Sequence, residues 1–244
     1  MTEARPHLAR ASVAADPPEQ PDCTEPLEPA FEAIYVKCRP FTMTGRARMY
    51  ALWQAINYTR GLPGSFVECG VWRGGSSMLA DLTLREAAVP RPIWMYDTYE
   101  GMPPPGPDDV DWIGMSPLDD WDAIKAEDGN VFACASLDDV KASIRSVGLD
   151  VSMIKFVAGR VEDTIPATMP DEIAVLRLDT DWYESTLHEL RHLWPRLVSG
   201  GVLIVDDYGH WQGARKAVDE FFAGRPDAPM LTRIDYTGRI ALKV

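Results

Sequence analysis

The sequence is short of basic side chains. It has 24 Lys and Arg residues against 37 Asp and Glu residues, which gives a formal net charge of −13. A protein that binds nucleic acid needs a basic face to neutralise phosphates. Anionic membrane surfaces attract the same positive charge. The composition therefore argues against nucleic-acid and membrane partners.

Cysteines are few, and long apolar runs are missing. The four cysteines, Cys23, Cys38, Cys69 and Cys134, include no C-x-x-C pair, so neither a zinc knuckle nor a disulfide framework is indicated. No apolar run reaches the length of a transmembrane helix, and the N-terminus lacks the pattern of a signal peptide. We expect a cytoplasmic protein whose thiols are reduced.

The chain is predicted to contain one domain behind a proline-rich lead-in. Residues 1–28 are rich in proline and poor in large apolar side chains, so we expect them to be disordered. Residues 29–244 form the predicted domain, which begins with a helical cap at 29–62. Thr44 is placed to cap the second helix of this segment. Residues 98–120 are rich in Pro, Gly and Asp, which is typical of a functional lid loop.

From residue 65 onward, strand and helix patterns alternate. The predicted strands are 65–71, 93–97, 153–157, 173–179 and 202–206, and the predicted helices are 75–88, 137–147, 185–197 and 211–222. Two short strands, 230–234 and 239–244, then form a closing hairpin. This order predicts an α/β fold with a mostly parallel sheet, helices on both faces and an antiparallel C-terminal strand.

The dinucleotide fingerprint G-x-G-x-x-G is absent after the first predicted strand. The sequence there has E-x-G-x-x-x-G instead, from Glu68 through Gly70 to Gly74, and Asp97 follows 27 residues after Gly70. Glycines let a ligand approach the backbone. A carboxylate at this point would repel a pyrophosphate but suit an ammonium group, and an acid at Asp97 can accept hydrogen bonds from ribose hydroxyls. S-adenosylmethionine carries both groups; the alternative is a packing turn with a solvated Asp97.

Two pairs of acids follow the fourth and fifth predicted strands. Asp179 and Asp181 end one strand, and Asp206 and Asp207 end the next, with 27 positions from Asp179 to Asp206. Because parallel strands finish at one edge, the four carboxylates are expected to meet there and to need a cation. Oxygen ligands select Mg²⁺, Ca²⁺ or Mn²⁺, and an acid left off the metal could act as a general base. The alternative is ordinary turn and helix-cap chemistry.

One helix contains the letters of a zinc-protease motif. His188-Glu189-Leu-Arg-His192 matches H-E-x-x-H. Pro195 limits this helix, and no third ligand follows at a plausible distance. The apolar stripe places both histidines at the flank of a helix that covers the sheet: Leu187, Leu190, Trp194 and Leu197. We therefore interpret the motif as coincidental.

Several longer motifs together resemble the macrocin O-methyltransferase family, over about residues 31–244. They are Arg39-Pro-Phe-Thr-Met-Thr44, Phe66-Val-Glu-Cys-Gly-Val-Trp-Arg-Gly-Gly75, Tyr96-Asp-Thr-Tyr-Glu-Gly-Met-Pro103, Asp163-Thr-Ile-Pro166, Leu178-Asp-Thr-Asp-Trp-Tyr-Glu-Ser-Thr186, Val205-Asp-Asp-Tyr208, Trp211-Gln-Gly213, Ala217-Val-Asp-Glu-Phe221 and Asp235-Tyr-Thr-Gly238. The resemblance implies a class I methyltransferase fold with a seven-stranded sheet. It also implies the use of S-adenosylmethionine and Mg²⁺.

The resemblance also implies roles for individual residues. Asp179, Asp206 and Asp207 would hold the metal, and Asp181 would take the proton of the substrate hydroxyl. The residues expected near the cofactor are Thr42, Met43, Glu68, Gly70, Gly74, Ser76, Asp97, Val161, Glu162 and Asp179. Family members also suggest a homo-oligomer.

The resulting prediction is an O-methyltransferase for a sugar hydroxyl of a glycosylated natural product or a nucleotide sugar, as in antibiotic biosynthesis. Two alternatives stay open: methylation of a non-sugar small-molecule hydroxyl, and a non-catalytic cofactor-binding scaffold of the same fold. Catechol-type relatives place a Lys base shortly after the first metal-binding Asp. The segment 180–184 has no Lys, which makes an aromatic-hydroxyl mechanism of that kind less favoured.

Overall fold

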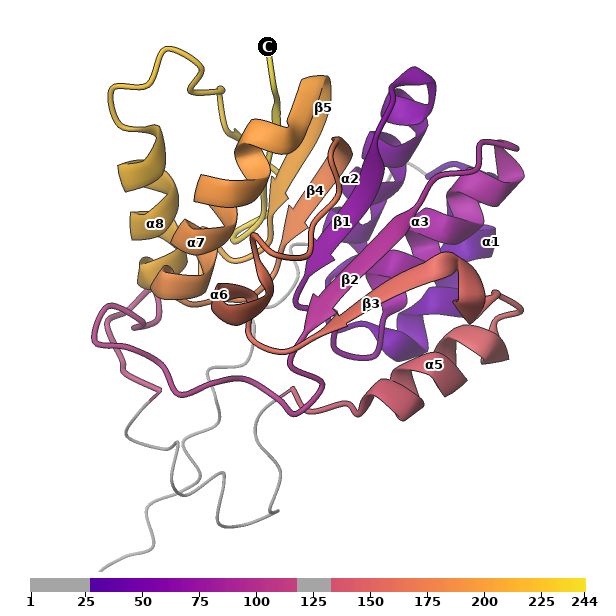
Figure 1. The fold of residues 1–244 in the computed structure, drawn as a ribbon, viewed down its shortest axis with the longest axis horizontal. Helices are drawn as coiled ribbons and strands as arrows, with labels where there is room; N and C mark the ends of the chain where they lie inside the picture. The colour runs from indigo at the N-terminus through magenta and orange to yellow at the C-terminus, as the bar shows by residue number, and fades with distance from the viewer. Residues whose placement is uncertain (1–26, 118–132) are drawn as a thin grey trace, which may run out of the picture.

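The computed structural model of the protein describes residues 27–117 and 133–244. The predicted disordered lead-in lies outside the described residues except for its last two positions, and so do residues 118–120 of the predicted lid loop. A seven-stranded sheet runs through the described part, with the strand order β3-β2-β1-β4-β5-β7-β6 (Figure 1). The prediction of a mostly parallel α/β sheet is confirmed.

The first five strands are parallel and the last two add the antiparallel edge. Their bounds are β1 Ser65–Cys69, β2 Ile93–Asp97, β3 Ile154–Ala158, β4 Ile173–Leu178, β5 Leu197–Val205, β6 Thr232–Arg233 and β7 Arg239–Leu242. The strand β7 lies between β5 and β6, so the predicted closing hairpin forms with its second strand paired to β5. The parallel arrangement brings the carboxyl ends of β1, β2, β4 and β5 to one edge.

Helices cover both faces of the sheet, as predicted. One face carries α1 (Pro29–Cys38), α2 (Arg46–Tyr58), α3 (Gly75–Glu86) and α5 (Leu137–Ser146). The other carries α6 (Val161–Thr164), α7 (Tyr183–Leu193) and α8 (Gln212–Phe222). Side chains alternate between the faces along each strand: in β1, Phe66 packs in the first core and Val67 in the second.

The N-terminal helical segment differs from the prediction at one residue. Thr44 does not cap α2, because the helix begins at Arg46 and Gly45 precedes it without a side-chain cap. The hydroxyl of Thr44 instead accepts a hydrogen bond from Arg177 in β4. This contact ties the start of α2 to the sheet beneath it. In the described part of the chain, no helix combines the length and hydrophobicity needed to cross a membrane.

Candidate active site

The glycine turn after β1 is fixed by contacts with the neighbouring strand. Gly70 has a φ of +79°, and a Cβ added there would lie 2.0 Å from the carbonyl oxygen of Asp179. Only glycine fits such an approach. The carboxylate of Asp97, at the end of β2, accepts hydrogen bonds from the backbone N–H groups of Val71 at 2.8 Å and Trp72 at 3.1 Å. Asp97 therefore shapes the turn as well as facing the space above it.

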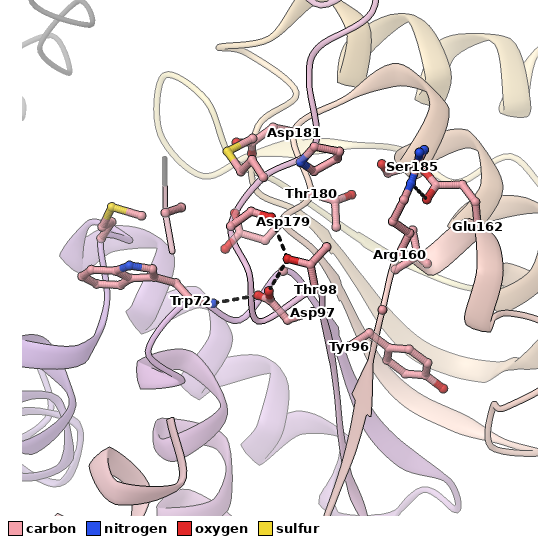
Figure 2. Close-up of a pocket in the computed structure, with 18 residues that line it drawn as sticks. Trp72, Tyr96, Asp97, Thr98, Arg160, Glu162, Asp179, Thr180, Asp181 and Ser185 are labelled. Atoms are coloured by element: carbon pink, nitrogen blue, oxygen red, sulfur yellow. Dashed lines mark hydrogen bonds and ion pairs between the residues drawn. The ribbon is translucent and has the colours of Figure 1, made fainter. Parts of the chain in front are cut away.

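A cavity of about 120 Å³ opens beside this turn (Figure 2). Trp72 lies toward one end, and Arg160, Glu162 and Ser185 lie toward the other. Six of the predicted cofactor residues line it: Met43, Gly70, Asp97, Val161, Glu162 and Asp179. Its lining combines apolar side chains with a few carboxylates, as is typical of sites that bind small organic ligands.

The other four predicted cofactor residues do not line this cavity. Gly74 has a φ of +86° and precedes α3, whose first turn contains Ser76. The hydroxyl of Thr42 accepts a hydrogen bond from the backbone N–H of Thr44 at 3.0 Å. Glu68 is fully buried beneath the turn. The cofactor role of these four residues stays a prediction.

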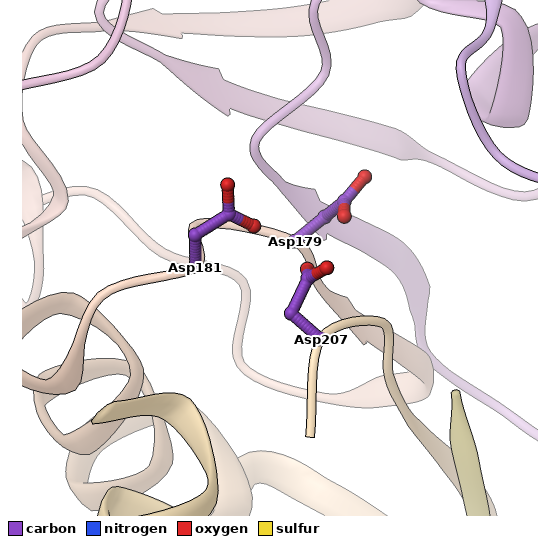
Figure 3. A group of neighbouring side chains, drawn as sticks. All are labelled: Asp179, Asp181 and Asp207. Atoms are coloured by element: carbon purple, nitrogen blue, oxygen red, sulfur yellow. The ribbon is translucent and has the colours of Figure 1, made fainter. Parts of the chain in front are cut away.

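Three carboxylates gather beyond the cavity. Asp179 and Asp181 follow β4, and Asp207 follows β5 (Figure 3). One oxygen from each lies within 4.8 Å of the others. Among the described residues, Oδ2 of Asp207 is one of the few buried side-chain oxygens with no hydrogen-bond partner. An all-oxygen donor set with an orphaned oxygen fits a hard divalent cation.

The charges of these acids are poorly balanced by their surroundings. Burial raises the pKa of Asp207 well above its ordinary value, and Asp181 and Asp206 raise it further. Burial also raises the pKa of Asp179, against the effect of Arg177. The pKa of Asp181 rises to about 7, mainly through burial. Removing carboxylates from water and bringing them together favours their neutral forms, which a bound cation would reverse.

Asp206 is not part of this group of three, although it neighbours Asp179. Its Oδ1 accepts a hydrogen bond from Arg177 at 2.5 Å, and its Oδ2 pairs with Arg48. Burial would raise the pKa of Asp206, but Arg177 and Arg48 outweigh it and lower the pKa. The prediction that Asp206 binds the metal stays a prediction. The sequence pattern did not anticipate that two arginines take both of its oxygens.

Arg177 connects Glu68 in β1 with the acids that follow β4 and β5. Its side chain is 1% exposed, and it donates to Glu68 at 2.6 Å and to Asp179 at 2.6 Å as well as to Asp206. Glu68 also accepts a hydrogen bond from Ser77 in α3. Arg177 was not predicted from the sequence, although a charged residue inside the apolar run of β4 was a visible signal.

The H-E-x-x-H helix holds no third metal ligand. Nε2 of His188 lies 3.0 Å from the carbonyl oxygen of Ile165, and the ring of His192 lies 4.5 Å from that of His188. Over residues 27–117 and 133–244, neither histidine belongs to a group of three metal-binding side chains. Glu189 points inward and is fully buried, which the apolar stripe did not predict.

The described part of the 98–120 loop is anchored to the helices after β4 and β5. Oδ1 of Asp109 accepts a hydrogen bond from the backbone N–H of Tyr183 at 2.7 Å, at the start of α7. The backbone N–H of Gln212, at the start of α8, donates to Val110 at 2.8 Å. These bonds hold the loop next to the acids.

Comparisons with known proteins agree with this geometry. The sequence profile of the Macrocin-O-methyltransferase (TylF) family matches residues 37–241. The chain is 36% identical over 200 residues to the 8-demethyl-8-(2,3-dimethoxy-alpha-L-rhamnosyl)-tetracenomycin-C 4'-O-methyltransferase of Streptomyces olivaceus, covering 81% of this chain and 73% of that protein. It is 34% identical, with the same coverage, to the demethyldecarbamoylnovobiocin O-methyltransferase of Streptomyces niveus.

Solved structures of methyltransferases also resemble this chain. The O-methyltransferase NovP superposes with a TM-score of 0.72 at 33% identity, covering 84% of this chain and 82% of that chain. The calicheamicin methyltransferase CalS11 superposes with a TM-score of 0.60 at 19% identity, covering 89% and 94% of the two chains. The second likeness supports the class I methyltransferase fold alone.

Proposed function

The chain belongs to the macrocin O-methyltransferase family, and we propose that it methylates a sugar hydroxyl of a glycosylated natural product or a nucleotide sugar. It is an O-methyltransferase with the class I fold. The observation that carries the proposal is a group of three carboxylates beside the cavity at the glycine turn, in a chain whose relative from Streptomyces olivaceus is named for a rhamnosyl substrate.

The cavity is proposed to hold S-adenosylmethionine, which supplies a methyl group on a sulfonium. Asp97 would accept hydrogen bonds from the ribose hydroxyls, while Val161 and Glu162 would contact the adenine. Gly70 would let the methionine part pass close to the backbone. Met43, whose side chain is largely exposed at the cavity wall, would cover the bound cofactor.

The methionine end of the cofactor is proposed to lie at the first turn of α3, near Glu68. Gly74 and Ser76 would shape that turn, and Thr42 would support it from the N-terminal segment. Glu68 already shares its carboxylate with Arg177 and Ser77. Any effect of Glu68 on cofactor affinity would therefore pass partly through these contacts.

The acids are proposed to hold Mg²⁺ through Asp179 and Asp207, with Asp206 as the further ligand. When bound, Mg²⁺ would fix the substrate hydroxyls and lower the pKa of the reacting one. Asp181 would accept the hydroxyl proton. Its carboxylate belongs to the group of three acids and also lines the cavity, so it would lie between the proposed metal and the proposed cofactor, where a general base is needed.

A methyl-transfer assay with deuterated S-adenosylmethionine tests the function. We expect label to appear in a rhamnoside acceptor and not in a catechol, and we expect EDTA to abolish transfer. Label in the catechol alone would move the activity to a non-sugar hydroxyl. Failure of the chain to bind S-adenosylhomocysteine in calorimetry would support the scaffold alternative instead.

Three Asp→Asn variants separate the proposed roles. Asp181→Asn should lower kcat by about 100-fold or more, the range for loss of a general base, while the affinity for S-adenosylhomocysteine stays the same. Asp206→Asn should weaken Mn²⁺ binding in a titration followed by electron paramagnetic resonance. Asp171→Asn is the control, because this side chain is fully exposed and lies outside the cavity and the acid group. Full activity of Asp181→Asn would remove Asp181 from the mechanism.

A further inference from the structure

Glu189 occupies an unusual place for a carboxylic acid. It lies in α7 with 0% of its surface exposed, on the helix face that packs against the sheet. Its carboxyl oxygens accept a hydrogen bond from the hydroxyl of Thr180, at 3.0 and 3.2 Å, and the thiol of Cys69 adds another. Burying a carboxyl group costs free energy unless it is hydrogen-bonded. These contacts therefore stabilise the buried side chain of Glu189.

The partner of Glu189 stands directly before the proposed base. Thr180 is followed by Asp181, whose φ is +67°. This left-handed backbone is uncommon for a residue other than glycine and persists only where the surroundings enforce it. The backbone N–H of Trp182 donates to the carbonyl oxygen of Thr180 at 2.7 Å, which closes a tight turn around Asp181.

The residue after Asp181 is also held. Trp182 is buried, and its indole N–H donates to the carbonyl oxygen of Pro103 at 2.9 Å. Its ring meets that of Trp211 edge to face, with the centroids 5.0 Å apart. The turn is therefore fixed on the side of Trp182 by the loop and by α8. On the side of Thr180, Glu189 supplies the side-chain contact.

We propose that Glu189 is a positioning residue, which holds Thr180 and thereby keeps Asp181 in the left-handed turn that directs its carboxylate toward Asp179 and Asp207. This inference rests on the proposed function, because it assigns Glu189 a role through the proposed base. It also explains why the glutamate of the H-E-x-x-H letters faces inward: it serves the end of β4 and no metal.

Glu189→Leu and Glu189→Gln form the test pair. Leu cannot accept the hydrogen bond from Thr180, so kcat should fall by about 10- to 100-fold, the range in which a displaced group slows a reaction. The KM for S-adenosylmethionine and the affinity for S-adenosylhomocysteine should change less than about twofold, which is small compared with the expected loss of kcat. Gln keeps an accepting oxygen, and burial raises the pKa of Glu189 well above its ordinary value, which favours the neutral form that Gln resembles. Gln should therefore recover most of kcat.

Thr180→Val and Thr180→Ser repeat the test from the other side of the bond, and they decide it if Glu189→Leu does not fold. Valine keeps the shape of the side chain and removes the hydroxyl, so it should reproduce the loss of kcat, whereas serine should recover it. Glu86→Leu is the matched control, because Glu86 is an exposed helical glutamate at the end of α3.

Crystal structures of the variants give a result that does not depend on turnover. In Glu189→Leu, Asp181 should leave the left-handed region, and in Glu189→Gln it should stay. Unchanged kcat in Glu189→Leu and Thr180→Val, or equal losses in Glu189→Leu and Glu189→Gln, would overturn the inference. If the wild-type chain shows no methyl transfer, the proposed function fails. The conformation of Asp181 in the two crystal structures then decides the positioning role alone.

Discussion

Replacing Arg177 with methionine is expected to destabilise the protein strongly. The guanidinium is 1% exposed and donates to three carboxylates, those of Glu68, Asp179 and Asp206, at 2.5–2.6 Å. Removing one partner of a buried ion pair costs about 3–5 kcal/mol, because the remaining charge stays buried without compensation. Methionine fills a similar volume, so the loss of charge dominates the effect.

This free energy converts into a readable change of melting temperature. For a domain of this size, 1 kcal/mol shifts Tm by about 2–4 °C, so Arg177→Met should melt roughly 6–20 °C below the wild type. Arg177→Lys keeps the charge but loses the branched guanidinium, which can bond to several acids at once. The Tm of this variant should lie between those of Arg177→Met and the wild type. Differential scanning calorimetry at pH 8 measures all three proteins.

The pH dependence separates charge from packing. Burial raises the pKa values of Glu68 and Asp179 even with Arg177 present, so in Arg177→Met these two carboxylates should have folded-state pKa values further above their unfolded ones, whereas Asp206 keeps Arg48. A carboxylate with a raised folded pKa destabilises the fold above that pKa, and the penalty fades as pH falls toward the unfolded pKa. The deficit of Arg177→Met should therefore shrink from pH 8 to pH 5. A deficit caused by poor packing would stay constant.

The control is Arg196→Met. Arg196 pairs with the fully exposed Asp171 at 3.2 Å, and such surface pairs contribute about 0–1 kcal/mol. Its Tm should stay within about 3 °C of the wild type. The reasoning is refuted if Arg177→Met melts as close to the wild type as this control does.

Three further predictions concern the cofactor, the histidines and the thiols. Asp97→Ala should weaken the binding of S-adenosylhomocysteine about 10- to 150-fold in calorimetry, the loss expected for hydrogen bonds to a charged group; an unchanged Kd would remove Asp97 from the cofactor site. The double substitution of His188 and His192 by alanine should leave the zinc content unchanged in mass spectrometry of the metal, and a loss of stoichiometric zinc would contradict our interpretation of H-E-x-x-H. Burial raises the pKa of Cys38 to about 12, so at pH 8 its thiolate is about 10³-fold rarer than at an ordinary pKa of about 8.5. Iodoacetamide should label the exposed Cys134 and spare Cys38 until the protein unfolds, as peptide mass spectrometry can check; rapid labelling of Cys38 in the folded protein would contradict its burial.

The sequence determined the fold through local patterns. Apolar runs of strand length alternate with amphipathic helices, and this order permits essentially one right-handed parallel arrangement. The placement of Asp97 at the end of β2 agrees with an expectation drawn from the sequence, whereas the close fit of Gly70 against Asp179 was not predicted. The acids after β4 and β5 were also expected at one edge, because parallel strands finish together.

Only the tertiary structure decided which acids face one another. Glu68 is in register with Arg177, and Arg177 with Ile204. Asp206 stands two residues beyond Ile204 and therefore lies on the same face of the sheet as Arg177, which donates to it. Register across three strands brings Glu68, Arg177 and Asp206 together, and no single segment of sequence contains it.

The same holds for the contacts that fix the turn after β4. Thr44 and Arg177 are 133 residues apart in sequence, and Thr180 meets Glu189 from the next helix. A helical pattern names the face that is buried, but it does not tell whether a polar residue on that face finds a partner. The sequence by itself thus determined the fold and the supply of carboxylates at the sheet edge. Packing between distant elements decided which of these carboxylates contact Arg177 and Arg48 and which of them form the group of three.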